Sequence, residues 1–240
     1  MRILVVADVH GDTEKLDAIL KESEAMKPDV IVCPGDFTDM YQQNTVFSQA
    51  DIGEMIVQKL LAHNKNVLCV PGNQDPYEMI AIFDEYGVNI HGRTRKVMST
   101  IFAGWGGAQT PFNTLIEPTP EETKHVLGQF KQKLAGKDFV MVVHNPPKDT
   151  KLDLAGGDKH VGSDDIRKFV EEAEPRLLIS AHIHESAAID RLGDTAMFYP
   201  GPVFEGKYGI VDIHDDKCEC RIFSLKSRTT NPKQQRKNAK

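Results

Sequence analysis

The stretch RILVVADVH, residues 2–10, joins an apolar run to two polar side chains, Asp8 and His10. The run has the length and the β-branched residues of a buried strand, so Asp8 and His10 follow where that strand should end. An amphipathic segment, TEKLDAILKESEAM (13–26), comes next, and its apolar residues fall on one face of a helix. A buried strand followed by a covering helix indicates an α/β fold.

The same alternation continues through the first half of the chain. The apolar runs DVIVC (29–33) and NVLCV (66–70) are each followed, directly or after a polar loop, by a helix-like segment. These segments are DIGEMIVQKLLAHN (51–64) and PYEMIAIFDEYG (76–87). The pattern of strand, helix, strand and helix predicts a sheet with covering helices.

The second half predicts more strands than helices. Short strands are expected within residues 88–107, a helix from the capping box at 119–122 to about Leu134, and another helix that Ser163 opens. Five further apolar runs are expected to form strands: DFVMVV (138–143), RLLIS (176–180), TAMFY (195–199), YGIVDI (208–213) and CECRIFSL (218–225).

The composition is that of an ordinary soluble globular protein, with 240 residues of which 40% are apolar and 27% charged. No internal repeat or linker divides the sequence, so one domain is expected over residues 1–225. We expect no signal peptide and no membrane span, because no apolar stretch is long enough. Four cysteines without a CxxC pair are typical of a reducing compartment, which predicts a cytoplasmic protein.

The last fifteen residues, 226–240, hold six Lys or Arg and no acid, which leaves the other 225 residues with a net charge of −12. We interpret this tail as a solvated, disordered end, and the alternative is an arm that binds nucleic acid. The acidic body argues against extended binding to a phosphate backbone. Nucleic acid is therefore expected as a partner only through the tail.

Polar residues gather where five of the expected strands end. Each is a weak signal alone, because Asp after a strand often forms a turn or a helix cap. In an open α/β sheet, however, ligands bind at the edge where the carboxyl ends of the strands meet. Five such ends together predict a site there. The residues are Asp8, His10, Asp36, Asn73, Gln74, Asp75, His144, His182 and His184.

Seven of these side chains could bind a metal ion, and none is a thiolate. Three offer a carboxylate or amide oxygen and four offer an imidazole: Asp8, Asp36 and Asn73, and His10, His144, His182 and His184. That mixture suits Mn²⁺, Fe or Zn²⁺ in a catalytic site better than a structural zinc. Seven ligands fit two ions about 3.5–4 Å apart that share a bridging carboxylate and a water. His182 and His184 would point to opposite sides of an extended segment, so their rings could flank such a pair. A pair of ions of this kind generates hydroxide near neutral pH and holds phosphoryl oxygens.

In order and spacing, the motifs Asp-x-His, Gly-Asp, Gly-Asn-x-Asp, His and His-x-His resemble the calcineurin-like metallophosphoesterases. The segments TKLDLAGGDKHVGS (150–163) and AHIHES (181–186) are most similar to the small prokaryotic phosphodiesterase branch of that family. The resemblance implies a four-layer α/β/β/α sandwich with two mixed sheets. It also implies two metal ions bridged by Asp36, the first held by Asp8, His10, Asp36 and His184 and the second by Asp36, Asn73, His144 and His182.

The chain departs from the family pattern at Gln74. Many members have His there, assigned as the proton donor to the leaving group, and an amide cannot take that role. Gln74 would instead hydrogen-bond a phosphate oxygen or orient Asp75, and Asn73 could also contact the phosphate. His160 is a candidate for the missing acid, and the alternative is an ordinary surface histidine in a loop.

These features predict a phosphodiesterase that depends on two divalent metal ions and hydrolyses a small phosphoester, with nucleotides among the candidates, by attack of metal-bound hydroxide. Mn²⁺ is the favoured ion, and Fe, Zn, Ni and Mg are the alternatives. The competing interpretations are a phosphomonoesterase or nuclease with the same site, and a non-catalytic scaffold that keeps the fold and binds a protein. The sequence does not predict the oligomeric state.

Overall fold

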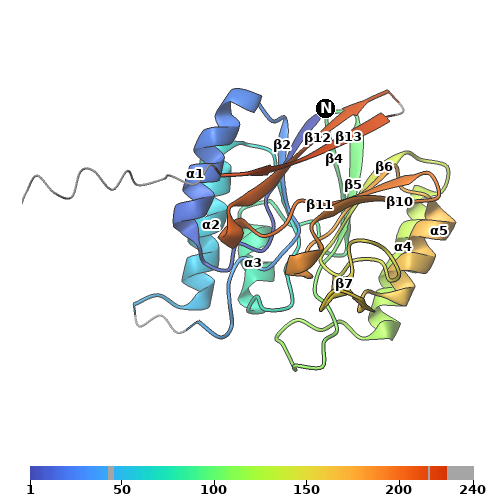
Figure 1. Ribbon diagram of the computed structural model, residues 1–240, viewed down its shortest axis with the longest axis horizontal. Helices are drawn as coiled ribbons and strands as arrows, with labels where there is room; N and C mark the ends of the chain where they lie inside the picture. Colours follow the sequence, from blue (N-terminus) through green and yellow to red (C-terminus); the bar gives the residue numbers. More distant parts are fainter. Residues whose placement is uncertain (43–45, 216, 226–240) are drawn as a thin grey trace, which may run out of the picture.

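Two mixed β-sheets lie face to face between two layers of helices in the computed structural model, which describes residues 1–42, 46–215 and 217–225 (Figure 1). The strands of the first sheet, in spatial order, are β13 (Lys217–Ser224), β12 (Lys207–His214), β1 (Arg2–Val5), β2 (Val30–Cys33) and β3 (Val67–Cys69). Strands β1, β2 and β3 are parallel, whereas β12 and β13 extend the sheet in antiparallel fashion.

The second sheet has a parallel centre and an antiparallel strand at each edge. In spatial order its strands are β10 (Ala188–Leu192), β11 (Thr195–Tyr199), β9 (Leu177–Ile179), β6 (Phe139–Val143), β5 (Thr100–Trp105) and β4 (Arg93–Val97). The four central strands run parallel, and β10 and β4 pair antiparallel with their neighbours. The parallel strands of each sheet therefore deliver their carboxyl ends to one edge.

Along a strand of the first sheet, alternate residues pack into two different apolar layers. Leu4 packs toward the helices α1 (Thr13–Ser23), α2 (Gln49–His63) and α3 (Glu78–Glu85), while its neighbour Val5 packs between the two sheets. A third apolar layer joins the second sheet to the two remaining α-helices. These are α4 (Pro120–Leu134) and α5 (Asp164–Ala173). Three apolar layers between four layers of elements confirm the predicted α/β/β/α sandwich.

The helix starts follow the sequence signals closely. Thr119 and Glu122 form the expected capping box, with Pro120 at the first position of α4. Ser163 caps α5 by accepting a hydrogen bond from the backbone N–H of Ile166. Both helices therefore begin within a residue of the predicted start.

Three short elements differ from the prediction. Residues 88–92 form isolated bridges instead of a strand. Strand β10 was not expected, and the predicted loop 146–162 contains a small hairpin of β7 (Leu154–Ala155) and β8 (Lys159–His160). Three 3-10 turns complete the described chain: η1 (Glu24–Met26), η2 (His184–Ser186) and η3 (Val203–Glu205).

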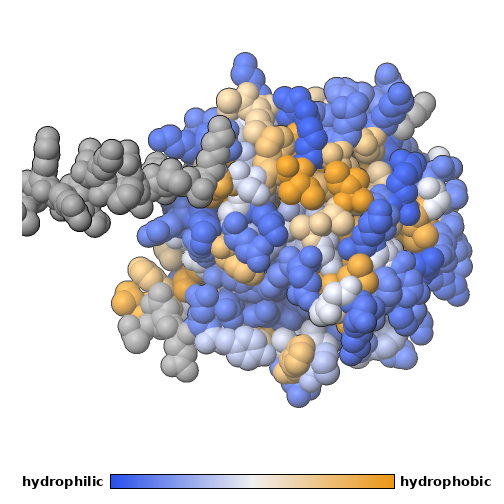
Figure 2. Space-filling view, viewed as in Figure 1, coloured by the Kyte–Doolittle hydropathy of each residue, from blue (hydrophilic) through white to orange (hydrophobic). Residues whose placement is uncertain are grey.

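Within the described residues, no helix is both long and apolar enough to cross a membrane. The face of the molecule in Figure 2 is mainly hydrophilic, and its apolar areas are small. The predicted basic tail, residues 226–240, lies outside the described part of the chain.

Candidate metal centre

The loops that follow β1 and β2 adopt an unusual backbone conformation at the edge of the sheets. Asp8, His10 and Asp36 have positive φ angles of 50°, 46° and 53°, a region that residues other than glycine seldom occupy. Backbone hydrogen bonds hold these loops together, from the N–H of Asp8 to the carbonyl of Gly35 (3.1 Å) and from the N–H of His10 to the carbonyl of Asp36 (3.0 Å). Such conformations persist only where the surroundings fix them, and they cluster at functional sites.

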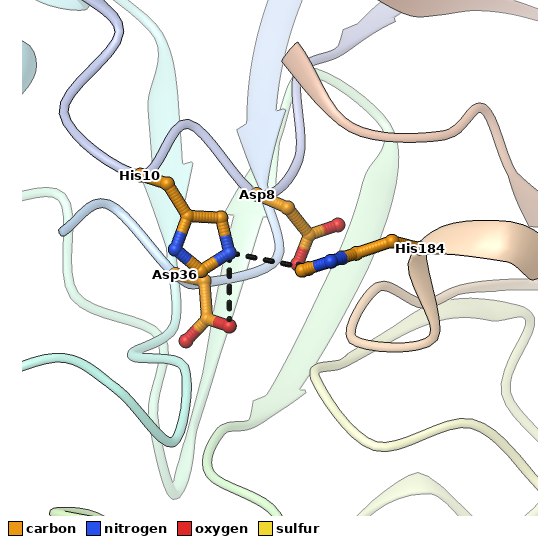
Figure 3. A group of neighbouring side chains, drawn as sticks. All are labelled: Asp8, His10, Asp36 and His184. Atoms are coloured by element: carbon orange, nitrogen blue, oxygen red, sulfur yellow. Dashed lines mark hydrogen bonds and ion pairs between the residues drawn. The ribbon is translucent and has the colours of Figure 1, made fainter. Parts of the chain in front are cut away.

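Asp8, His10, Asp36 and His184 form a first group, in which one donor atom from each lies within 4.8 Å of the others. The Nε2 atom of His10 lies 3.1 Å from Nε2 of His184 and 3.5 Å from Oδ2 of Asp36. Figure 3 shows the four side chains converging, with the His10 ring facing both Asp36 and His184. A carboxylate and imidazole set of this kind fits a divalent transition-metal ion.

Asp36, His144 and His182 form a second group within the same 4.8 Å limit. The Nδ1 atom of His144 donates to the carbonyl of Pro34 (2.9 Å), so Nε2 is left to face the group. Asn73 joins this group through its Oδ1 atom, which lies 2.9 Å from Nε2 of His144. Two ligands at right angles, each about 2.1 Å from an ion, lie roughly 3 Å apart, so the pair suits a shared metal.

Asp36 is common to both groups. Its Oδ1 atom accepts a hydrogen bond from the backbone N–H of Gln74 (3.0 Å). Its Oδ2 atom is buried without a hydrogen-bond partner among the described residues, 3.5 Å from Nε2 of both His10 and His144. Burial of a carboxylate oxygen without a hydrogen-bond partner is energetically unfavourable unless the oxygen is paired with a cation or binds a metal. The position of Oδ2 between the two groups therefore fits a carboxylate that bridges two ions.

In the second group, Asp36 and His144 each shift the pKa of the other. Burial by itself would raise the pKa of Asp36, but the neighbouring His144 imidazole lowers it below its usual value. Burial opposes a charge on His144 too, yet the Asp36 carboxylate raises the pKa of His144 to about 9. Burial lowers the pKa of His182 to about 3, which keeps that ring neutral and able to bind a metal.

Asp75 lies behind the metal groups rather than within them. It is fully buried and accepts hydrogen bonds from the backbone N–H groups of Gly72 (2.7 Å) and Thr38 (3.0 Å). Burial, with the charge of Asp36 adding to it, raises the pKa of Asp75 to about 6. Asp75 thus ties the loop after β3 to the loop after β2.

Gly72 leaves room for the Asp36 carboxylate. A Cβ atom added at Gly72 would lie 2.0 Å from Oδ1 and 2.2 Å from the backbone nitrogen of Asp36. The φ angle of Gly72 is not positive, so the requirement for glycine is one of space.

Tyr199 was not predicted as part of the site. Its hydroxyl donates to Oδ2 of Asp8 (2.7 Å), and the backbone N–H of His182 donates to Oδ1 of the same carboxylate (3.1 Å). Both bonds fix the orientation of the Asp8 carboxylate within the first group. In the sequence Tyr199 lies at the end of an apolar run, and that position does not reveal its pairing with Asp8.

A pocket of about 470 Å³ opens beside the first group. Gln74 lines it, and the Oε1 atom of Gln74 is buried without a hydrogen-bond partner in the described structure. His160 does not line this pocket; its Nδ1 atom lies 2.7 Å from Oδ1 of Asp153. The pocket is lined by His10, Gly11, Asp12, Asp39, Tyr41, Gln42, Gln74, His184 and Phe204.

Known proteins resemble this chain at the level of sequence. Residues 1–186 match the sequence profile of the Metallophos family, described as calcineurin-like phosphoesterase. An uncharacterized protein of Methanocaldococcus jannaschii, MJ1162, is 34% identical over 226 residues, which cover 90% of this chain and 96% of that protein.

Solved structures share the fold at lower identity. The protein TT1561 of Thermus thermophilus matches with a TM-score of 0.71 at 18% identity, over 92% of this chain and 97% of that one. A dimetal phosphatase from Danio rerio matches with a TM-score of 0.64 at 8% identity, over 93% and 96% of the two chains. At these identities the structural matches support the fold alone.

Proposed function

The chain belongs to the calcineurin-like phosphoesterase family, and from that premise we propose that it is a phosphodiesterase dependent on two divalent metal ions, with Mn²⁺ favoured. The observation that carries the proposal is the Oδ2 atom of Asp36, which is buried, lacks a hydrogen-bond partner among the described residues and lies 3.5 Å from an imidazole nitrogen of each metal group. A single carboxylate shared by two ligand groups is the arrangement that a dinuclear centre requires.

Each of the two ions would be held by its own set of side chains, with Asp36 common to both sets. When bound, the ions would activate water and hold the phosphoryl oxygens. In this proposal the first ion is held by Asp8, His10, Asp36 and His184, and the second by Asp36, Asn73, His144 and His182.

A diester fits the pocket better than a monoester. None of the described residues that line the 470 Å³ pocket is Lys or Arg. A monoester carries up to two negative charges at neutral pH, whereas a diester carries one. A wall without cations therefore favours the less charged substrate.

The amide of Gln74 supplies no proton to the leaving group at this position. We expect Gln74→His to raise kcat on an alkyl diester by about 10²-fold, the lower part of the range for general acid catalysis. The rate on nitrophenyl diesters should change little, because nitrophenolate leaves without protonation. Kinetics on the two substrates test this, and an equal effect on both would contradict the role given to position 74.

His160 is the proposed replacement acid. Its Nδ1 atom faces Oδ1 of Asp153, a fully buried carboxylate, so Nε2 remains available for proton transfer. Two hydrogen bonds fasten the β7–β8 hairpin to η2, the turn that begins at His184: Gly156 N–H to Oε1 of Glu185 (2.6 Å), and the Ser186 hydroxyl to the Leu154 carbonyl. The hairpin that carries His160 therefore lies against the turn that carries a metal ligand.

We expect His160→Ala to slow hydrolysis of an alkyl diester by about 10²-fold and of a nitrophenyl diester much less. Asp153→Asn should reproduce part of the loss, because it leaves the imidazole without its charged partner. His125→Ala, on the exposed face of α4, is the matched control. If His160→Ala hydrolysed the alkyl diester as fast as the wild type, His160 would not be the acid and would be an ordinary surface histidine.

The experiment that tests the function is a substrate panel on metal-reconstituted protein. The panel contains nitrophenyl mono- and diesters, cyclic nucleotides, dinucleotides and a phosphoprotein, each with and without Mn²⁺. We expect Mn²⁺-dependent turnover with diesters cleaved fastest. Faster cleavage of monoesters would make the protein a phosphomonoesterase, and no turnover on any substrate with Mn²⁺ bound would favour a binding scaffold.

A further inference from the structure

The pocket beside the first metal group has an outer wall that the metal ligands do not form. Asp39, Tyr41 and Gln42 supply one side of it from the loop after β2, and Phe204 supplies another from η3. The loop is folded by its own contacts, since Oδ1 of Asp39 accepts from the backbone N–H of Tyr41 (2.8 Å) and the carbonyl of Asp39 accepts from the N–H of Gln42 (3.0 Å). The outer wall is thus a defined surface.

The outer wall carries one carboxylate, Asp39, that forms no ion pair within the described part of the chain. Asp12, the other carboxylate of the pocket, forms an ion pair with Lys15 at 2.6 Å. Among residues 1–42, 46–215 and 217–225, no Lys or Arg lines the pocket or forms an ion pair with Asp39. Asp39 is half-buried, so its charge faces a partly desolvated space. Electrostatics at this wall disfavour an anion and favour a cation.

Two aromatic side chains, Tyr41 and Phe204, line the same pocket as Asp39. Tyr41 is 65% exposed at the pocket rim. Phe204 is fixed by edge contacts with the rings of His10 and His184, at centroid distances of 5.4 Å and 4.9 Å. A pocket lined by a carboxylate and by aromatic rings has the groups that bind alkylammonium ions, through ion pairing and cation–π attraction.

We propose that this pocket binds an alkylammonium group, of the choline or ethanolamine kind, on one alcohol of the phosphodiester substrate. The inference rests on the proposed function, because the metal centre would hold the phosphoryl group next to the pocket. Asp39 is then a specificity-determining residue: it selects among diesters and takes no part in bond cleavage. A substrate with a second phosphate in this position, such as a nucleoside diphosphate derivative, would place an anion against Asp39.

A pair of isosteric substrates tests the inference. Nitrophenyl phosphocholine carries the cation, and its dimethylbutyl analogue replaces the ammonium nitrogen by carbon at the same shape and leaving group. We expect wild-type kcat/KM to be about fivefold higher for the choline ester, the upper end for one partly exposed charge pair. Asp39→Asn should remove this preference, so that kcat/KM for the choline ester falls to about that of the uncharged analogue. Glu85→Gln, at an exposed carboxylate at the end of α3, is the matched control and should keep the preference.

Calorimetric titration of choline into the Mn²⁺-loaded protein gives a readout that needs no turnover. We expect choline to bind the wild type and the Glu85→Gln variant, and to bind Asp39→Asn about fivefold more weakly. If no diester is cleaved but choline binds in an Asp39-dependent manner, the proposed function fails and the ammonium site stands. If the two isosteres are cleaved with equal efficiency, the ammonium site is overturned and the phosphodiesterase stands. If Asp39→Asn binds choline as tightly as the wild type, the ammonium site is overturned whether or not diesters are cleaved.

Discussion

The Asp36→Asn variant is expected to lose hydrolysis by at least about 10³-fold and to bind fewer than two metal ions per chain. Loss of a single group that stabilises charge in a transition state already costs about 10²–10³-fold, and Asp36 belongs to both ligand groups. The amide keeps the shape of the side chain and can still accept the hydrogen bond from the backbone of Gln74. The defect should therefore lie in the charge and coordination of Oδ2.

Metal content by elemental analysis and kcat on a nitrophenyl diester measure this effect. Asp212→Asn is the matched control. Asp212 is a buried carboxylate in β12 that forms an ion pair with Arg2, and it belongs to neither ligand group. It should lower stability but retain two ions and full activity. Two tightly bound ions in Asp36→Asn would show that Asp36 does not bridge them.

The Gly72→Ala variant is expected to lose metal binding and at least about 10²-fold in activity although no ligand is changed. The added methyl group would lie 2.0 Å from Oδ1 and 2.2 Å from the backbone nitrogen of Asp36, so the loop after β2 must move. Overpacking of this kind costs about 1–3 kcal/mol of stability. Thermal unfolding, metal content and kcat on the same preparation separate the loss of stability from the loss of the site.

Gly128→Ala provides the opposite control. Gly128 lies in α4, and a Cβ atom added there meets no atom within 4 Å. Alanine in a helix interior is preferred over glycine by about 0.5–1 kcal/mol, so this variant should be more stable and fully active. If Gly72→Ala were as stable and as active as Gly128→Ala, the absence of a side chain at Gly72 would not be needed for function.

The strand ends could be predicted from sequence because their signal is local. An apolar run that stops at Asp or His places that side chain at the edge of the sheet, whatever the details of the loop. This reasoning located Asp8, Asp36 and His144, and the structure brings them together. Pairings such as that of Tyr199 with Asp8 depend on the register of β11 against β9, which no local pattern encodes.

One local prediction reached the right placement through the wrong geometry. His182 and His184 do contribute to different ligand groups. They do so because His182 has a φ angle of 80° and His184 begins a 3-10 turn, and the expected extended segment is absent from this stretch. The role of Gly72, which leaves space for the Asp36 carboxylate, was not predicted. Backbone conformation at a strained loop depends on tertiary contacts, so residue spacing alone does not determine it.

The outer wall of the pocket could not be predicted at all. Asp39, Tyr41 and Gln42 lie in an irregular loop that shows no helical or strand periodicity. Phe204 comes from a 3-10 turn 165 residues after Asp39. Such residues are recognised as neighbours only when the fold is known.

Each ligand group draws on both sheets. In the first group Asp8 and Asp36 follow strands of one sheet and His184 follows a strand of the other; in the second group Asp36 faces His144 and His182 in the same way. Binding of ions at the proposed centre would therefore be thermodynamically linked to the spacing of the two sheets. The apolar layer between the sheets, which includes Val5 and Val142, would consequently help to set the metal affinity of the proposed centre.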